Sequence, residues 1–79
     1  MNEKDKDRHL REINSSMNIL KENDLISIHA YNIYTVINGK YKTHKVNFME
    51  LEGSLTYIDS SGNIQTMSFI LIESIRKGS

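Results

Sequence analysis

The sequence predicts an α+β fold in which one N-terminal helix packs on a small antiparallel sheet or on a small β-barrel. Two observations lead to this prediction. Residues 5–22 repeat apolar side chains at steps of three and four, as an amphipathic helix does. From residue 25 onward, β-branched and aromatic side chains dominate and are interrupted by turn signals. Short turns between such runs favour antiparallel strands.

The helix expected over residues 5–22 has a single apolar stripe. Asp5 or Asp7 is expected to cap its start, because a carboxylate accepts hydrogen bonds from the free N–H groups of the first turn. Asn23 is expected to end the helix in a left-handed conformation. The stripe, which must pack on the sheet, consists of Leu10, Ile13, Met17 and Leu20.

The first expected strand is long and covers residues 25–37. Alternation puts Asn32 on the apolar side of this strand, where a polar side chain is unfavourable, so a bulge or bend is expected near residues 31–33. Asn38-Gly39 is a strong signal for a hairpin turn, and the return strand is expected over residues 41–52, ending at Gly53. The apolar side of the first strand consists of Ile26, Ile28, Ala30, Tyr34 and Val36.

The second half of the chain predicts another hairpin. Its strands are expected over residues 55–59 and 64–69, around a tight turn at residues 60–63. The apolar run that follows is compatible with a short closing strand or with a single helical turn, and periodicity over four residues favours neither. This run consists of Phe69, Ile70, Leu71 and Ile72, with Ile75 beyond it.

Length and composition limit what the protein can be. A chain of 79 residues is expected to form one domain over residues 1–79, with frayed ends at 1–4 and 76–79. The net charge is zero, so no global field attracts nucleic acid or an anionic membrane. Cysteine is absent, and no apolar run reaches the length of a membrane span. The expected location is the cytoplasm, without association with a membrane.

Side chains that carry chemistry are few and scattered. His9, His29 and His44 lack the close spacing of paired metal ligands, and without cysteine no thiolate site can form. No nucleophile elbow or phosphate-binding glycine loop is present. We therefore expect no metal, no cofactor and no catalytic residue, so the protein is not expected to be an enzyme.

The segment of residues 38–45 concentrates positive charge around an aromatic side chain. If residues 38–39 form a turn, one face of the hairpin carries Lys40, Lys42 and His44, and the other carries Tyr41, Thr43 and Lys45. Such a strand could hold phosphates and stack a base. The simpler interpretation is that lysines protect an exposed edge from unwanted pairing.

Two further segments are candidates for contact with a partner. Glu50 and Glu52 are expected to share a face with Phe48, which would present carboxylates beside an aromatic ring to a basic partner or simply to solvent. The run of Phe69, Ile70, Leu71 and Ile72 would expose apolar groups on both faces of a strand. Burial under the helix and pairing of two copies as a homodimer both remain open for this run.

The C-terminal half resembles the YolD-like family. The resemblance rests on residues 52–59, which include Gly53 and end in Ile58-Asp59, on residues 62–64, and on the spaced isoleucines of residues 67–75. These short proteins belong to low-GC Gram-positive bacteria and their phages. The resemblance implies an Sm-like small barrel and a bacterial or phage regulatory setting.

The function expected from these observations is binding. The favoured prediction is a small regulatory or inhibitory protein that binds a larger protein or complex. A phage gene is one origin considered for it. The alternative is a weak nucleic-acid-binding module that uses the hairpin of Lys40 to Lys45.

Overall fold

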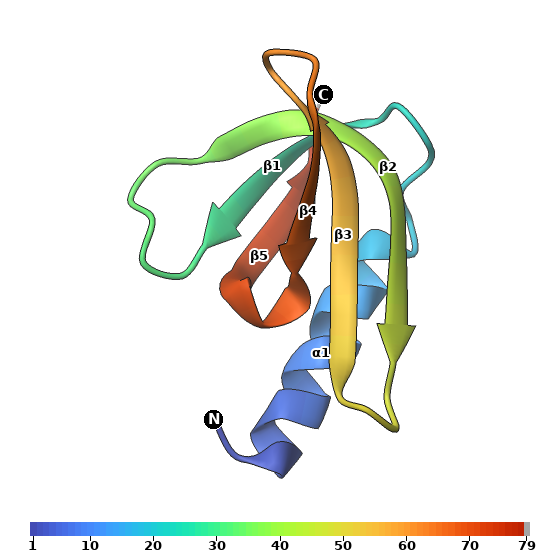
Figure 1. The fold of residues 1–79 in the computed structure, drawn as a ribbon, viewed down its shortest axis with the longest axis vertical. Helices are drawn as coiled ribbons and strands as arrows, with labels where there is room; N and C mark the ends of the chain where they lie inside the picture. The colour runs from blue at the N-terminus through green and yellow to red at the C-terminus, as the bar shows by residue number, and fades with distance from the viewer. Residues whose placement is uncertain (79) are drawn as a thin grey trace.

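The computed structural model of the protein describes residues 1–78 and contains one helix and a five-stranded antiparallel sheet (Figure 1). The elements are α1 (Glu3–Met17), β1 (Leu25–Ala30), β2 (Ile37–Asn47), β3 (Glu52–Asp59), β4 (Ile64–Ser68), the 3-10 turn η1 (Phe69–Leu71) and β5 (Ile72–Lys77). The strand order is β4-β3-β2-β1-β5. The predicted α+β class is confirmed. The sheet is not closed into a barrel, because β4 and β5 form its two ends.

The helix begins and ends earlier than predicted. Asn2 caps it by accepting a hydrogen bond of 2.8 Å from the backbone N–H of Asp5, so neither aspartate is the cap. Those aspartates instead pair with arginines one turn further on, Asp5 with Arg8 and Asp7 with Arg11. The apolar stripe of Leu10, Ile13, Met17 and Leu20 is buried as predicted, although Leu20 lies beyond the end of α1.

Asn23 has a left-handed conformation, with φ of 77°. It does not end the helix, however, because α1 stops at Met17. Asn23 lies in the connection to β1, where its N–H donates to the carbonyl oxygen of Tyr41 at 2.8 Å. This connection therefore runs beside β2, and its Leu20 side chain is buried in the core.

The long strand predicted over residues 25–37 is two separate strands. β1 stops at Ala30, and residues 31–36 form a loop before β2 begins at Ile37. Asn32 is left-handed, with φ of 67°, so the predicted bend is a complete exit from the sheet. Ile26, Ile28 and Ala30 are buried as predicted. The loop residues Tyr34 and Val36 are exposed, so their predicted place on the apolar side is wrong.

Asn38 and Gly39 do not form the predicted turn. They lie within β2, opposite Ser27 and Ile26 of β1. A Cβ atom on Gly39 would stand 2.6 Å from the carbonyl oxygen of Ile58, so this glycine permits β2 and β3 to approach closely. Gly53 likewise does not end a strand, since it lies inside β3, and a Cβ atom there would stand 2.5 Å from the ring of Phe69.

The second hairpin is confirmed, with β3 and β4 joined by a tight turn at residues 60–63. The Asp59 carboxylate accepts backbone N–H groups of Ser61 and Asn63, each at 2.9 Å. Gly62 has φ of 85°, which only glycine adopts readily. Hydrogen bonds from the Gln65 side chain and then from the backbone lower the pKa of Asp59.

The run of residues 69–72 begins as a helical turn and ends as a strand. Phe69–Leu71 form η1, and β5 starts at Ile72. Phe69 and Ile72 are fully buried whereas Ile70 and Leu71 are exposed. The buried side chains are three residues apart, as in a 3-10 turn, whereas in a strand they would be two residues apart. The four residues therefore do not form the edge strand that the predicted dimer required.

The core lies between α1 and the sheet, and α1 contacts β5, η1 and β2 (Figure 1). The chain ends are part of these elements as well: Glu3 and Lys4 lie in α1, and Arg76 and Lys77 lie in β5. The fraying predicted for residues 1–4 and 76–79 stays a prediction, and Ser79 lies outside the described residues. The buried side chains of the core are Leu10, Ile13, Met17, Leu20, Ile26, Ile28, Tyr41, Leu55, Tyr57, Phe69, Ile72 and Ile75.

Candidate interaction surface

A bulge in β2 changes the faces on which the predicted binding residues lie. Tyr41 pairs with Tyr57, and the next pair is Thr43 with Thr56, so Lys42 is one extra residue in β2. After this bulge the alternation is shifted by one residue. Lys40 and Lys45 therefore lie on the outer face, opposite the core, and the predicted division of faces is wrong.

His44 points inward as a result of the bulge. Its Nδ1 lies 2.5 Å from the Tyr41 hydroxyl, with which it shares a hydrogen bond, and its ring is 6.2 Å from that of Phe69. Burial lowers the pKa of His44 and raises the pKa of Tyr41. Tyr41 is therefore buried in the core, and His44 is half-buried against it, with its ring turned away from the outer face.

The lysines of the same segment have different environments. Lys42 lies 3.7 Å from the Glu22 carboxylate and forms a surface ion pair with it. Lys40 and Lys45 form no ion pair within the part of the chain that the structure describes. The segment predicted to be a basic hairpin tip is thus the middle of β2, a central strand. Two lysines without an ion-pair partner lie on its outer face.

The predicted acidic site spans a turn and the start of β3. Residues 48–51 form the turn between β2 and β3, so strand alternation does not apply to Glu50, and the face it was predicted to share with Phe48 and Glu52 does not exist. Phe48 and Leu51 both pack against the core, while Met49 is 95% exposed. Glu50 and Glu52 are both exposed at this end of the sheet.

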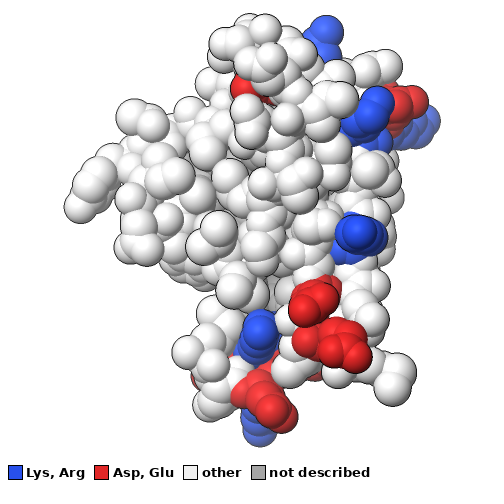
Figure 2. All heavy atoms as spheres, in the orientation of Figure 1, with Lys and Arg blue, Asp and Glu red and all other residues white. Residues whose placement is uncertain are grey.

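The most conspicuous exposed surface was not predicted. It consists of four side chains of the β1–β2 loop and one of η1, which we call the loop patch: Tyr31, Ile33, Tyr34, Val36 and Leu71. The loop and η1 are adjacent, because the Tyr31 N–H donates to the carbonyl oxygen of Leu71 at 2.9 Å. Figure 2 shows no Lys, Arg, Asp or Glu atoms over the loop, at the left of the view, whereas charges gather at the opposite edge and the lower end.

Contacts at the base of the loop hold the loop patch in place. The Tyr31 ring packs on the ring of His9, with centroids 5.8 Å apart, and the Ile33 N–H donates to the Ala30 carbonyl oxygen at 3.4 Å. Tyr34, in the middle of the loop sequence, is completely exposed, at 105% of its reference area. The sequence does contain a signal for this surface, since residues 31–36 include no charged side chain. The same run also fits a strand with one buried face, and that prediction is wrong because residues 31–36 lie outside the sheet.

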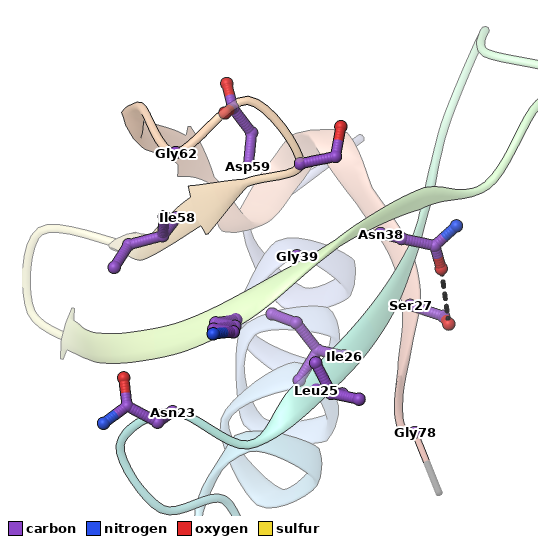
Figure 3. A pocket seen from close by; sticks show the side chains of 12 residues that line it. Asn23, Leu25, Ile26, Ser27, Asn38, Gly39, Ile58, Asp59, Gly62 and Gly78 are labelled. Atoms are coloured by element: carbon purple, nitrogen blue, oxygen red, sulfur yellow. Dashed lines mark hydrogen bonds between the residues drawn. The ribbon is translucent and has the colours of Figure 1, made fainter.

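The surface of the described residues also has two open grooves. The first, of about 590 Å³, lies where β1, β2 and β3 meet near the C-terminal end and is lined by Leu25, Gly39, Lys40 and Ile58 among others (Figure 3). The Ser27 hydroxyl donates to Asn38 Oδ1 at 3.0 Å beside it. The second, of about 540 Å³, includes Lys6, Lys45 and Ile70. In neither groove does a buried side-chain nitrogen or oxygen of the described residues lack a hydrogen-bond partner.

Residues 1–78 contain no cluster of metal-binding side chains and no helix that could span a membrane. Within that range, no three histidine, aspartate or glutamate side chains gather as metal ligands would. The one helix, α1, is too short and too polar to cross a bilayer.

Comparisons with protein-family models, with curated proteins and with solved structures found no match to this chain. The YolD-like resemblance therefore stays a prediction.

Proposed function

We propose that the protein is a small, non-catalytic regulatory or inhibitory protein that binds a larger protein through the loop patch. One observation carries this proposal: five exposed apolar side chains from two adjacent segments form an uncharged surface. Exposed apolar surface of this kind in a small protein marks interaction sites. Depletion of charge and enrichment in tyrosine are also typical of the centre of a protein–protein interface.

The charge distribution supports a protein partner above other macromolecules. Binding to nucleic acid or to an anionic bilayer depends on clustered Lys and Arg side chains. The loop patch has none, and the whole chain has a net charge of zero. Burial of apolar and aromatic groups against a partner is then the main favourable contribution that this surface can make.

The geometry of the loop favours Tyr34 as the anchor of the complex. A fully exposed tyrosine can bury its ring in a pocket of the partner while its hydroxyl hydrogen-bonds at the rim. The hydrogen bond from Tyr31 to Leu71 and the contact of Tyr31 with His9 fix the base of the loop. A fixed base lowers the conformational entropy lost on binding.

Affinity capture from a nuclease-treated Gram-positive lysate tests the proposal. The wild-type protein is compared with an Ile33→Ser/Tyr34→Ser variant and with a matched control, Lys40→Gln/Lys45→Gln, that alters the outer face only. We expect one stoichiometric protein partner with the wild type and the control, and its loss with the loop variant. Capture that survives the loop changes, or that disappears with nuclease, contradicts the proposal.

One observation favours nucleic-acid binding as a second candidate function. The bulge brings Lys40 and Lys45 onto one outer face, where the strand register adds hydroxyl groups of Thr43, Thr56 and Ser54. Lysines and hydroxyls of this kind contact phosphates without reading sequence. A salt titration of binding to single-stranded DNA and RNA tests it: salt-sensitive binding that is lost in Lys40→Gln/Lys45→Gln supports this candidate, and the absence of binding at low salt excludes it.

The proposed setting is the cytoplasm of a bacterium, with a phage gene as one origin. The YolD-like resemblance of residues 52–75 supports this setting. The lack of cysteine is consistent with a reducing compartment.

A further inference from the structure

The two edges of the open sheet differ in their protection against strand pairing. The β5 edge carries Glu73, Arg76 and Lys77, and its pairing with β1 shifts register near Ala30. Charged side chains and irregular pairing both hinder the addition of another strand. β4 has neither feature. Its sequence is Ile-Gln-Thr-Met-Ser, and all five residues pair in regular register with β3.

The free edge of β4 is exposed along its first three residues, whereas Met67 and Ser68 at its end are half-buried. Each of its residues pairs with β3, and none pairs with any other strand of the described chain. Ile64 is 63% exposed, and Gln65 and Thr66 are also exposed. An edge of this kind presents unpaired backbone N–H and C=O groups, which are a template for a further strand.

We propose that β4 pairs antiparallel with β4 of a second copy, about a two-fold axis at Thr66. This register is self-complementary: Thr66 faces Thr66 of the second copy, Gln65 faces Met67, and Ile64 faces Ser68. No position brings like charges together, because β4 has no charged residue. The pairing joins two five-stranded sheets into one continuous sheet, and a two-fold axis closes the assembly at two copies.

The outer face of the sheet supports the register centred on Thr66. Within one copy, strand pairing already aligns Thr43, Thr56 and Thr66 in a row across β2, β3 and β4. The two-fold axis continues this row into the second copy, and threonine pairs across neighbouring strands are favourable. A head-to-tail pairing of β4 with β5 would instead set this neutral row beside the charged edge of β5.

The dimer is expected to be weak. A pair of five-residue strands buries much less than the roughly 1,200 Å² of a standard stable interface. β4 and the β1–β2 loop belong to different parts of the sheet, with β3 and β2 between β4 and β1. No residue of the loop patch lies in β4, so the pairing uses none of its side chains, and this inference does not depend on the proposed function.

Single-cysteine variants test the pairing directly, because the chain has no cysteine of its own. Residues that face each other across antiparallel strands have Cβ atoms about 4.5–5.5 Å apart, close enough for a disulfide after a small adjustment. Under mild oxidation we expect Thr66→Cys to form a covalent dimer at least about tenfold faster than Gln65→Cys or Arg76→Cys. Gln65 is the matched control, since it is also exposed and adjacent but faces Met67 of the second copy.

Several outcomes would overturn the proposal. Equal rates for the three variants would mean random collision, and no dimer from a folded Thr66→Cys protein would exclude the register. A disulfide in a mixture of Thr66→Cys and Arg76→Cys, without one in Thr66→Cys alone, would indicate head-to-tail pairing of β4 with β5. Independently, sedimentation of the wild type at about 1 mM should show dimer that Thr66→Lys reduces and Arg76→Glu does not, because lysines would meet at the two-fold axis. A wild-type protein that sediments as a monomer at about 1 mM contradicts the proposal.

Discussion

The Nε2–H of His9 donates a hydrogen bond of 3.0 Å to the carbonyl oxygen of Phe69, 60 residues further along the chain. The same carbonyl accepts the N–H of Ile72, the bond that closes η1. His9 thereby joins α1 to the 3-10 turn whose Leu71 carbonyl accepts the N–H of Tyr31. A buried histidine in the helix thus holds both segments that form the loop patch.

Replacing His9 with leucine should destabilise the protein by about 1–2 kcal/mol. The change removes one bond to a buried carbonyl and the ring contact with Tyr31. Urea unfolding followed by circular dichroism measures the loss. His29→Ala is the control, since His29 is exposed and its replacement should cost less than about 0.5 kcal/mol. Equal costs at the two positions would show that the link to Phe69 does not stabilise the fold.

Neighbouring isoleucines after β4 should respond very differently to substitution. Ile72→Ala should cost about 2–4 kcal/mol, because Ile72 is fully buried. Ile70→Lys should cost little, because Ile70 points to solvent from η1. Chemical denaturation of both variants checks this difference. If the lysine at position 70 also unfolds the protein, residues 69–72 are not arranged as a 3-10 turn.

Gly53→Ala should destabilise the protein by about 1–3 kcal/mol through overpacking, because the new methyl group would stand 2.5 Å from the Phe69 ring. A second change, Phe69→Leu, should reduce this penalty by making room. The double-mutant cycle measures that coupling from unfolding free energies. The matched control is Gly62→Ala, which is strained by φ of 85° with no atom nearby, so Phe69→Leu should not relieve it. Additive costs for Gly53→Ala and Phe69→Leu would rule out the contact.

Stability should fall as the pH falls below about 6.5, and His44 should account for part of that fall. Burial lowers the pKa of His44 below its usual 6.5, so the unfolded chain binds the proton more readily and protonation favours unfolding. Above the usual pKa this contribution is constant. The unfolding free energies of the wild type and of His44→Phe, measured between pH 7.5 and 5.0, test the contribution of His44. The variant should lose less stability than the wild type over this range. The Asp59 pKa is also lowered, but its stabilising contribution is lost only in more acidic solution. Identical pH profiles would exclude a role for His44.

Local sequence patterns predicted those parts of the fold that are determined by neighbouring residues. The helical spacing of Leu10, Ile13 and Met17 predicted a buried face, and the turn at residues 60–63 follows from Asp59 and Gly62. The helix ends were less predictable. Asn2 could cap the helix as well as Asp5 could, and sequence alone does not rank the two.

The misassigned parts depend on tertiary contacts. A glycine at position 39 is equally compatible with a turn and with a close approach of β2 to Ile58. Only the position of β3 distinguishes these two roles. The apolar loop of residues 31–36 has a composition typical of a strand, so its exposure could not be predicted from propensity. A single extra residue, Lys42, shifted the faces of the basic segment. The candidate surface was therefore less predictable than the fold.

The affinity of the captured partner for two single-residue variants tests the central claim most directly. Tyr34→Ala removes the exposed anchor of the loop patch, and Met49→Ala removes an equally exposed apolar side chain from the β2–β3 turn. Calorimetric titration of the purified partner should show binding weakened at least about tenfold by Tyr34→Ala, as for an aromatic hot spot, and unchanged by Met49→Ala. Wild-type affinity for Tyr34→Ala would contradict binding through the loop patch.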